Sequence, residues 1–459
     1  MTRIVSIIFR TILRNIFRFA CLIATLLRPG HFDHSQRQDG TLPALKDKLF
    51  WIYKYYFRQI EKPEKGCGIA EHFSAQRFDF ALPAGFRQEA EASLASGGDI
   101  LVSGHIRGDN TGELWNDVAP FFFDADIRCA NLESPVAPSQ PFTALPKNLL
   151  KKLELNNSPE VFDRCFQNGK FGESGTGITF FTTANNHALD RGESGLLETL
   201  DFLDQRGACH TGSFRSQADR DDIPVIEKNG IRFAFLSYTF SLNENTLPPG
   251  KEYLVNLLPL NRPGCDTGPI KKDAEKARKE KNADIVTACL HWSLEHESYP
   301  LRHFIDLGHE ILECGIDVII GNHSHTLQPA EKYTCTDPRT GLRKDGLIFY
   351  ALGDLLSWHP SKNSRLSALA KIHFSKGLID GRETTLISGA ELKPVYAYSK
   401  IRLERCADFR LLDLMKTALA IETGGDIQPF LSAKDLPAAL GTVSYATVSS
   451  RPVRTDQSP

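Results

Sequence analysis

Residues 318–325 read Val-Ile-Ile-Gly-Asn-His-Ser-His, an apolar, β-branched run that stops at two histidines. A short apolar run of this kind is typical of a buried strand. Two imidazoles one residue apart, in the loop beyond such a strand, suit neighbouring metal positions. An isolated pair would more simply be two solvated loop histidines. The interpretation of His323 and His325 as metal ligands therefore depends on the rest of the chain.

The same pattern recurs upstream, where other predicted strands lie next to polar side chains. A strand is predicted at 100–102, directly after Asp99, and others at 127–132, 178–183 and 285–290. The last three lead into Asn131 and Glu133, into Asn185-Asn186-His187, and into His291. Open α/β sheets collect their ligands at the carboxyl ends of the strands. We therefore expect these side chains to converge on one site.

The composition sets limits on the class of protein. The 459 residues are 41% hydrophobic and 24% charged, and 54 Lys and Arg against 56 Asp and Glu give a net charge of −2. This balance argues against nucleic-acid binding by bulk charge. The ten cysteines include no Cys-x-x-Cys pair, so no zinc ribbon is indicated. Helices predicted at 158–166, 196–203, 271–281 and 302–313 alternate with the strands, which predicts a largely parallel, covered sheet.

The two carboxylates have different expected roles. Asp99 stands at the edge of a buried strand, where a carboxylate needs a cation, a metal or a hydrogen-bond cluster. Glu133 is a candidate for bridging two ions, because each of its oxygens can bind one metal. A simple helix or loop cap is the alternative for Glu133.

The amides and imidazoles complete the candidate set. One asparagine of the Asn185-Asn186 pair can ligate through its side-chain oxygen, which leaves His187 to hydrogen-bond a scissile oxygen or phosphoryl group. Asp190 either orients His187 or begins the next helix. His291 is a ligand or a satisfied core group, and Glu295 follows it by four residues. Together these residues suit one or two divalent ions, Mn, Fe or Zn, of the kind that clamp phosphoryl oxygens.

The chain divides into five expected parts. Residues 1–60 contain an apolar stretch at 4–27, with five arginines within or beside it, and an aromatic run at 50–58, and we expect them to associate with a membrane surface. The alternative is that the apolar stretch forms an amphipathic helix that packs against its own domain or a partner. Residues 61–92 read as a connecting region, 93–360 as the main domain, 361–448 as strands and a helix near 409–420 that complete the core, and 449–459 as a polar tail.

The motifs in this order resemble the capsule synthesis protein CapA family. The resemblance rests on Gly98-Asp99, Asn131-Leu132-Glu133, the segment 184–192, His291-Trp292 with Glu295, the segment 321–329, and the segment 350–354, which ends at Asp354. It implies a calcineurin-like metallo-dependent phosphatase fold, in which a layered β-sheet sandwich is flanked by helices. It also implies a role in poly-γ-glutamate capsule biosynthesis.

The resemblance further implies roles for individual residues. Asp99 and His325 would hold one metal, Asn186, His291 and His323 the other, with Glu133 between them. His187 and Asp190 would act on substrate, and Asn131, Asn185, Glu295 and Asp354 would line its binding site. Leu101 stands where such phosphoesterases usually have a ligating histidine, so the first metal would be short of a ligand unless His105 reaches it.

Three functions follow from these observations. The chain is expected to be a membrane-associated, CapA-like protein of capsule or cell-wall polymer synthesis. In that role a metal-type cleft would handle an anionic polymer such as poly-γ-glutamate, within a membrane-bound complex. The alternatives are a metal-dependent phosphoesterase or other hydrolase, and a metal-free anion-binding module. Nucleic acid is not an expected partner.

Overall fold

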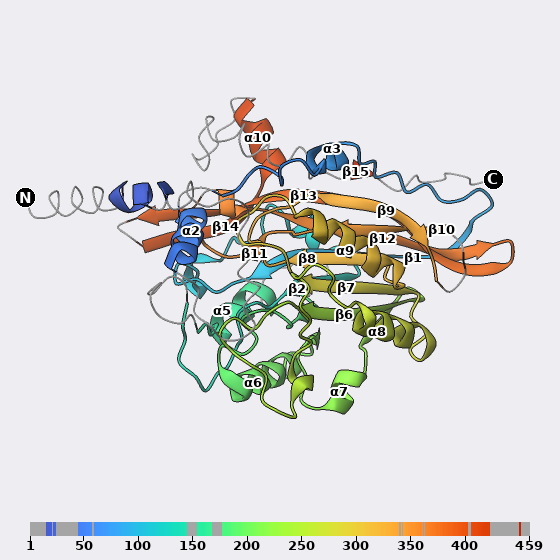
Figure 1. Ribbon diagram of the computed structural model, residues 1–459, viewed down its shortest axis with the longest axis horizontal. Helices are drawn as coiled ribbons and strands as arrows, with labels where there is room; N and C mark the ends of the chain where they lie inside the picture. Colours follow the sequence, from blue (N-terminus) through green and yellow to red (C-terminus); the bar gives the residue numbers. More distant parts are fainter. Residues whose placement is uncertain are drawn as a thin grey trace, which may run out of the picture.

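A computed structural model describes residues 15–20, 22–23, 45–56, 59–144, 154–167, 177–338, 341, 343–359, 361, 363–402, 405–422 and 449–450. Within these residues the chain forms two β-sheets packed against each other, with helices on their outer faces (Figure 1). This is the layered sandwich flanked by helices that the resemblance implied, and it is confirmed.

The first sheet has nine strands in the order β14-β13-β12-β1-β2-β3-β4, with β11 beside β1 and β15 beside β13. β1 to β4 run parallel, so their carboxyl ends lie at one edge, whereas β12, β13 and β14 are antiparallel. The strands are β1 (Arg87–Ile100), β2 (Ile127–Asn131), β3 (Phe180–Thr182), β4 (Cys209–Thr211), β11 (Asp354–Leu356), β12 (Leu366–Ile379), β13 (Arg382–Arg402), β14 (Arg405–Asp413) and β15 (Ser449–Ser450).

The second sheet has six strands in the order β5-β6-β7-β8-β10-β9. β6, β7, β8 and β10 are parallel. The hairpin between β5 and β6 turns through Asn229 and Gly230 with φ of 51° and 77°, as predicted for a tight Asn-Gly turn. The strands are β5 (Val225–Lys228), β6 (Ile231–Thr239), β7 (Ile285–His291), β8 (Val318–Asn322), β9 (Ala330–Thr336) and β10 (Arg343–Phe349).

Side-chain alternation along the strands builds the layers. Phe180 points between the sheets, where its ring stacks on Phe235 with centroids 4.2 Å apart. The next residue, Phe181, points the other way and packs on Phe162. The helices that cover the sheets, or flank them, are α2 (Leu45–Tyr56), α3 (Ile69–Ser74), α4 (Ala119–Phe122), α5 (Pro159–Phe162), α6 (Gly192–Asp204), α7 (Gln217–Asp221), α8 (Gly268–Lys279), α9 (Arg302–Glu313) and α10 (Leu414–Glu422).

Three segments differ from the sequence prediction. The connecting region at 61–92 contains α3 and the first residues of β1, which begins at Arg87 rather than near Gly97. This part of β1 is largely exposed and is held by backbone pairing with β12, so it carries little apolar alternation. β1 also ends at Asp99-Ile100 instead of starting there. The helix predicted near 409–420 begins only at Leu414, because Phe409 and Leu411 belong to β14 of the first sheet and are buried in an apolar core cluster.

A close backbone approach between β1 and β11 sets the position of Asp99. A Cβ on Gly98 would lie 1.7 Å from the carbonyl oxygen of Gly353, which also accepts a hydrogen bond from the Asp99 amide at 3.0 Å. We expect Gly98→Ala to lower the free energy of unfolding by about 3 kcal/mol or more, because backbone must move. Gly112→Ala is the matched control, since only the Arg164 side chain lies within 4.0 Å of its Cβ. Denaturant unfolding that gave both variants the same stability would contradict this account of the sheet edge.

Candidate metal centre

The predicted site residues lie where the carboxyl ends of strands from both sheets meet. Asp99 of β1 is in register with Asn131 of β2 on one side and with Asp354 of β11 on the other. In the second sheet His291 of β7 is in register with Asn322 of β8. The His323 amide donates to Asp99 Oδ2 at 2.8 Å, which joins the edges of the two sheets.

Two overlapping groups of ligand-type atoms form the centre. Atoms of Asp99, Glu133 and His291 lie within 4.8 Å of one another, and so do atoms of Glu133, His323 and His325. Glu133 belongs to both groups, and all five side chains are buried. Asp99 is equally near two imidazoles, since its Oδ1 lies 3.9 Å from His291 Nδ1 and its Oδ2 lies 3.9 Å from His325 Nδ1, the residue with which the resemblance had paired it.

Glu133 lies at the centre of the cluster without a hydrogen bond to its carboxylate. The residue is 0% exposed, and neither side-chain oxygen accepts a hydrogen bond from any described residue. His291 Nε2 lies 3.5 Å and His325 Nε2 3.7 Å from Glu133 Oε1. Burial and the nearby Asp99 raise the pKa of Glu133 well above its usual range, and burial raises the pKa of Asp99 to about 7. Two buried carboxyl groups thus share a site whose donor set fits a divalent cation.

His291 is held as a neutral imidazole. Its Nε2 is 2.9 Å from Asn186 Oδ1, and the Asn186 amide nitrogen donates to Asn243 at 3.2 Å, which turns the oxygen toward His291. Burial, with added repulsion from His325 and His187, lowers the pKa of His291 well below its usual value. Neutral imidazole is the form that binds metals. Asn186 and His291 therefore lie together at the centre, where the sequence had placed them.

Asp354, expected to line the substrate site, orients His325. Its Oδ1 is 2.8 Å from His325 Nδ1, and its Oδ2 pairs closely with His359 Nε2. Burial lowers the pKa of His325, but the nearby Glu133 and Asp354 outweigh this effect and raise the pKa well above its usual value. A carboxylate on the far nitrogen of a ligand imidazole fixes the ring orientation.

Two histidines of this region were missed by the sequence analysis. His359 follows β11, a strand of three residues that is too short for hydrophobic periodicity to reveal. His296 follows β7 by five positions, is 0% exposed, and has a φ of 58°. Its ring lies 5.7 Å from that of His325 and 5.8 Å from that of His359. The one available signal was the pair of histidines, His291 and His296, beyond one strand.

His187 and Asp190 form a buried pair beside this centre. His187 Nδ1 is 2.7 Å from Asp190 Oδ2, an oxygen that also accepts from the Leu155 amide at 2.7 Å. Asp190 lies just before α6, so its role in orienting His187 and its place near a helix start coexist. The imidazole has a fixed orientation, as a group that transfers a proton or binds an anion requires.

The asparagines expected at the substrate make hydrogen bonds within the protein. Asn131 Nδ2 donates to Asp99 Oδ1 at 2.7 Å and lies 3.3 Å from His291 Nδ1. Asn185 Nδ2 donates to the Leu132 carbonyl at 2.8 Å, and its Oδ1 accepts from the His187 amide at 3.1 Å. These amides hold the loops that carry the candidate ligands.

Helix α2 packs on one side of the centre. Lys54 Nζ and Glu297 Oε1 are 2.8 Å apart, and both side chains are 1% exposed. Trp51 donates its indole hydrogen to Glu295, which was expected to meet substrate. The Tyr55 ring lies 5.5 Å from those of His296 and His359. This part of the segment 1–60 therefore packs on the domain, whereas 1–14 and 24–44 lie outside the described residues.

His105 does not complete the first metal group. Its ring packs on Trp358 with centroids 4.1 Å apart, and it is absent from the described groups of potential ligands. Leu101 is buried in an apolar cluster with Val102. The group around Asp99 therefore has no ligand from the position where phosphoesterases usually have one.

Comparisons with known proteins agree with this arrangement of motifs. The chain is 25% identical over 300 residues to the capsule biosynthesis protein CapA of Bacillus anthracis, covering 63% of this chain and 66% of that protein. It is 25% identical over 311 residues to the PGA biosynthesis protein CapA of Bacillus subtilis, covering 65% and 71%. The match thus spans about two thirds of the length of these relatives.

Solved structures similar to the chain include a novel phosphatase from Mycoplasma pneumoniae, with 10% identity, coverage of 68% of this chain and 95% of that chain, and a TM-score of 0.36. A hypothetical protein from Thermus thermophilus matches with 13% identity, coverage of 64% and 98%, and a TM-score of 0.32. The model of the family described as bacterial capsule synthesis protein PGA_cap matches residues 93–358, which include every candidate ligand. Because this match covers more than half of the sequence, the chain belongs to the bacterial capsule synthesis protein PGA_cap family.

Proposed function

We propose that the chain binds one or two divalent ions, Mn, Fe or Zn, at this centre and uses them to handle an anionic capsule polymer such as poly-γ-glutamate. Glu133 carries the proposal, because a fully buried carboxylate without a hydrogen-bond donor is costly unless a cation compensates it. Carboxylate and imidazole together suit divalent transition metals. When bound, such ions supply Lewis-acid charge for anionic oxygens.

Some side chains of the centre would bind the ions, and others orient the side chains that bind them. Asp99, Glu133 and His291, with Asn186, would hold one ion, and Glu133, His323 and His325 the other. Asp354 keeps the His325 ring in place, and Asn131 does the same for the Asp99 carboxylate. His187, oriented by Asp190, is the group that would hydrogen-bond an incoming carboxylate or phosphoryl oxygen.

The capsule polymer is the proposed ligand because the chain belongs to a capsule synthesis family and its curated Bacillus relatives are named for capsule and PGA biosynthesis. Hydrolysis is the second candidate function, and the His187–Asp190 pair favours it, since a fixed imidazole is a frequent acid-base group. A metal-free anion-binding module is the third.

We further propose that residues 1–60 attach the chain to a membrane surface and to a membrane-bound biosynthesis complex. Residues 15–20 are helical and exposed, with Ile16 and Phe19 each 62% exposed beside Arg18. Exposed apolar and basic side chains on one helix are typical of interfacial binding. Among the described residues no helix is both long and apolar enough to cross a membrane.

The full chain should co-sediment with anionic phospholipid vesicles, whereas a variant with Arg10, Arg14 and Arg18 changed to Glu should not. Equal co-sedimentation of the two proteins would refute the attachment.

The metal prediction is tested with Glu133→Gln. Addition of Mn²⁺ at a hundred times its Kd should stabilise the metal-stripped wild type by about 2.7 kcal/mol, and the variant much less. Without metal the variant should be no less stable than the wild type, because a buried charge is gone. Glu198→Gln is the control, since this carboxylate binds Ser139 at the surface. A wild type that is purified without Mn, Fe or Zn and gains nothing from them would leave the metal-free module.

The accessory role and the hydrolase are separated by turnover. We expect the Mn²⁺-loaded wild type to hydrolyse generic phosphoesters far below the roughly 1–10³ per second of ordinary enzymes, because Leu101 supplies no ligand to the first group. A wild-type rate within that range, lost in His187→Ala, would establish the hydrolase instead. Polymer binding measured with Mn²⁺ present gives the positive readout for the accessory role.

A further inference from the structure

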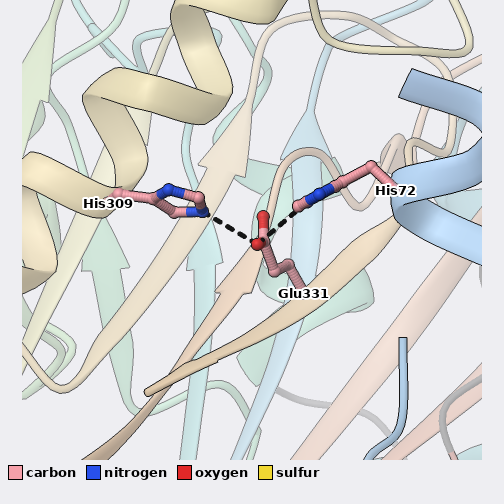
Figure 2. Close-up of side chains that lie close together, drawn as sticks. All are labelled: His72, His309 and Glu331. Atoms are coloured by element: carbon pink, nitrogen blue, oxygen red, sulfur yellow. Dashed lines mark hydrogen bonds and ion pairs between the residues drawn. The ribbon is translucent and has the colours of Figure 1, made fainter. Parts of the chain in front are cut away.

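A second group of metal-type side chains lies outside the centre described above. His72 of α3, His309 of α9 and Glu331 of β9 bring three potential ligand atoms within 4.8 Å of one another. Figure 2 shows both imidazoles pointing at the same oxygen of the Glu331 carboxylate. His72 Nε2 lies 2.9 Å and His309 Nε2 2.8 Å from Glu331 Oε1.

Two of the three separations between these atoms are close to those of a zinc site. Zinc binds imidazole nitrogen and carboxylate oxygen at about 2.0–2.2 Å in tetrahedral sites, which places two ligand atoms roughly 3.3 Å apart. The observed separations from Glu331 Oε1 are shorter by a few tenths of an ångström, so small side-chain movements would admit the ion. Two histidines and one glutamate form a donor set that zinc uses in proteins.

The surroundings fix the three side chains while leaving one side open. Tyr350 donates its hydroxyl to Glu331 Oε2 at 2.7 Å, so Oε1 remains for the imidazoles. The His309 ring stacks on Tyr333 with centroids 3.8 Å apart and an interplanar angle of 4°. Glu331 is 2% exposed, whereas the side chains of His72 and His309 are 24% and 19% exposed. An ion could therefore enter from solvent and keep a water as its fourth ligand.

We propose that His72, His309 and Glu331 bind a zinc ion that fastens helix α3 to the capsule-synthesis domain. α3 has only six residues and precedes the part of the chain that matches the family model, whereas His309 and Glu331 lie within that part. Phe73 of α3 already packs on Tyr350, with centroids 5.6 Å apart. The ion would add a metal-ligand link between the flanking segment and the domain, independently of the function proposed for the main centre.

The test compares zinc stoichiometry in full-length variants. Metal-stripped wild type, titrated with ZnCl₂, should bind one equivalent more than His72→Ala and one more than Glu331→Gln, a variant that preserves the shape of the side chain. His373→Ala is the matched control. His373 of β12 is 24% exposed and pairs with Glu391 of β13 at 3.0 Å, and it belongs to none of the groups of potential metal ligands among the described residues. The His373→Ala variant should bind as much zinc as the wild type.

Limited trypsin digestion provides a readout that does not involve the main centre. Zinc should slow cleavage at Lys65 and Arg77, which flank α3, at least tenfold in the wild type and not in His72→Ala. Equal zinc stoichiometry in the wild type and His72→Ala would overturn the site and leave a hydrogen-bonded triad. An extra equivalent of zinc without protection of α3 would overturn its fastening role.

Discussion

The structure of the candidate metal centre depends on the burial of carboxylates where the edges of the two sheets meet. Asp99 comes from the first sheet, Glu133 from the loop after its neighbouring strand, and His291 and His323 from the second sheet. All of these groups are buried, so bulk water cannot solvate their charges. Their mutual arrangement is therefore stable only with protons, hydrogen bonds or a cation between them, and Glu133 has no hydrogen bond of its own among the described residues.

The hydrogen-bond network around the centre explains why so many polar residues surround it. Asn131, Asn185 and Asp354 make hydrogen bonds to loops and side chains of the protein, and these bonds hold the candidate ligands in place. This is the arrangement that metal sites require, since ligand orientation depends on a second layer of partners. Helix α2, outside the part matched by the family model, packs against the same region through Lys54 and Trp51.

Much of the fold could be predicted because burial leaves a periodic signal. The apolar run before His323 and the half-apolar helix at 302–313 are found as expected. β1 was placed wrongly because its first residues are exposed and stabilised by backbone pairing, which leaves no pattern in the side chains. The strand β14 was mistaken for a helix because Phe409 and Leu411 fit either period over so short a run.

The candidate ligands were predictable as residues that follow buried strands, but their pairing was not. Asp99 lies 3.9 Å from an imidazole nitrogen of both His291 and His325, an arrangement that depends on the packing of one sheet on the other and that no sequence spacing encodes. The triad of His72, His309 and Glu331 could not be predicted for the same reason, since its members come from two helices and a strand, whereas His359 was missed because β11 is too short to show periodicity.

The most direct measurement is anomalous X-ray diffraction from crystals of protein purified without chelator, recorded at the absorption edges of Mn, Fe and Zn. The account predicts an anomalous peak within bonding distance of Glu133 and of at least one of His291, His323 and His325. A well-ordered centre with no anomalous peak, in which Glu133 is hydrogen-bonded to water, would contradict it.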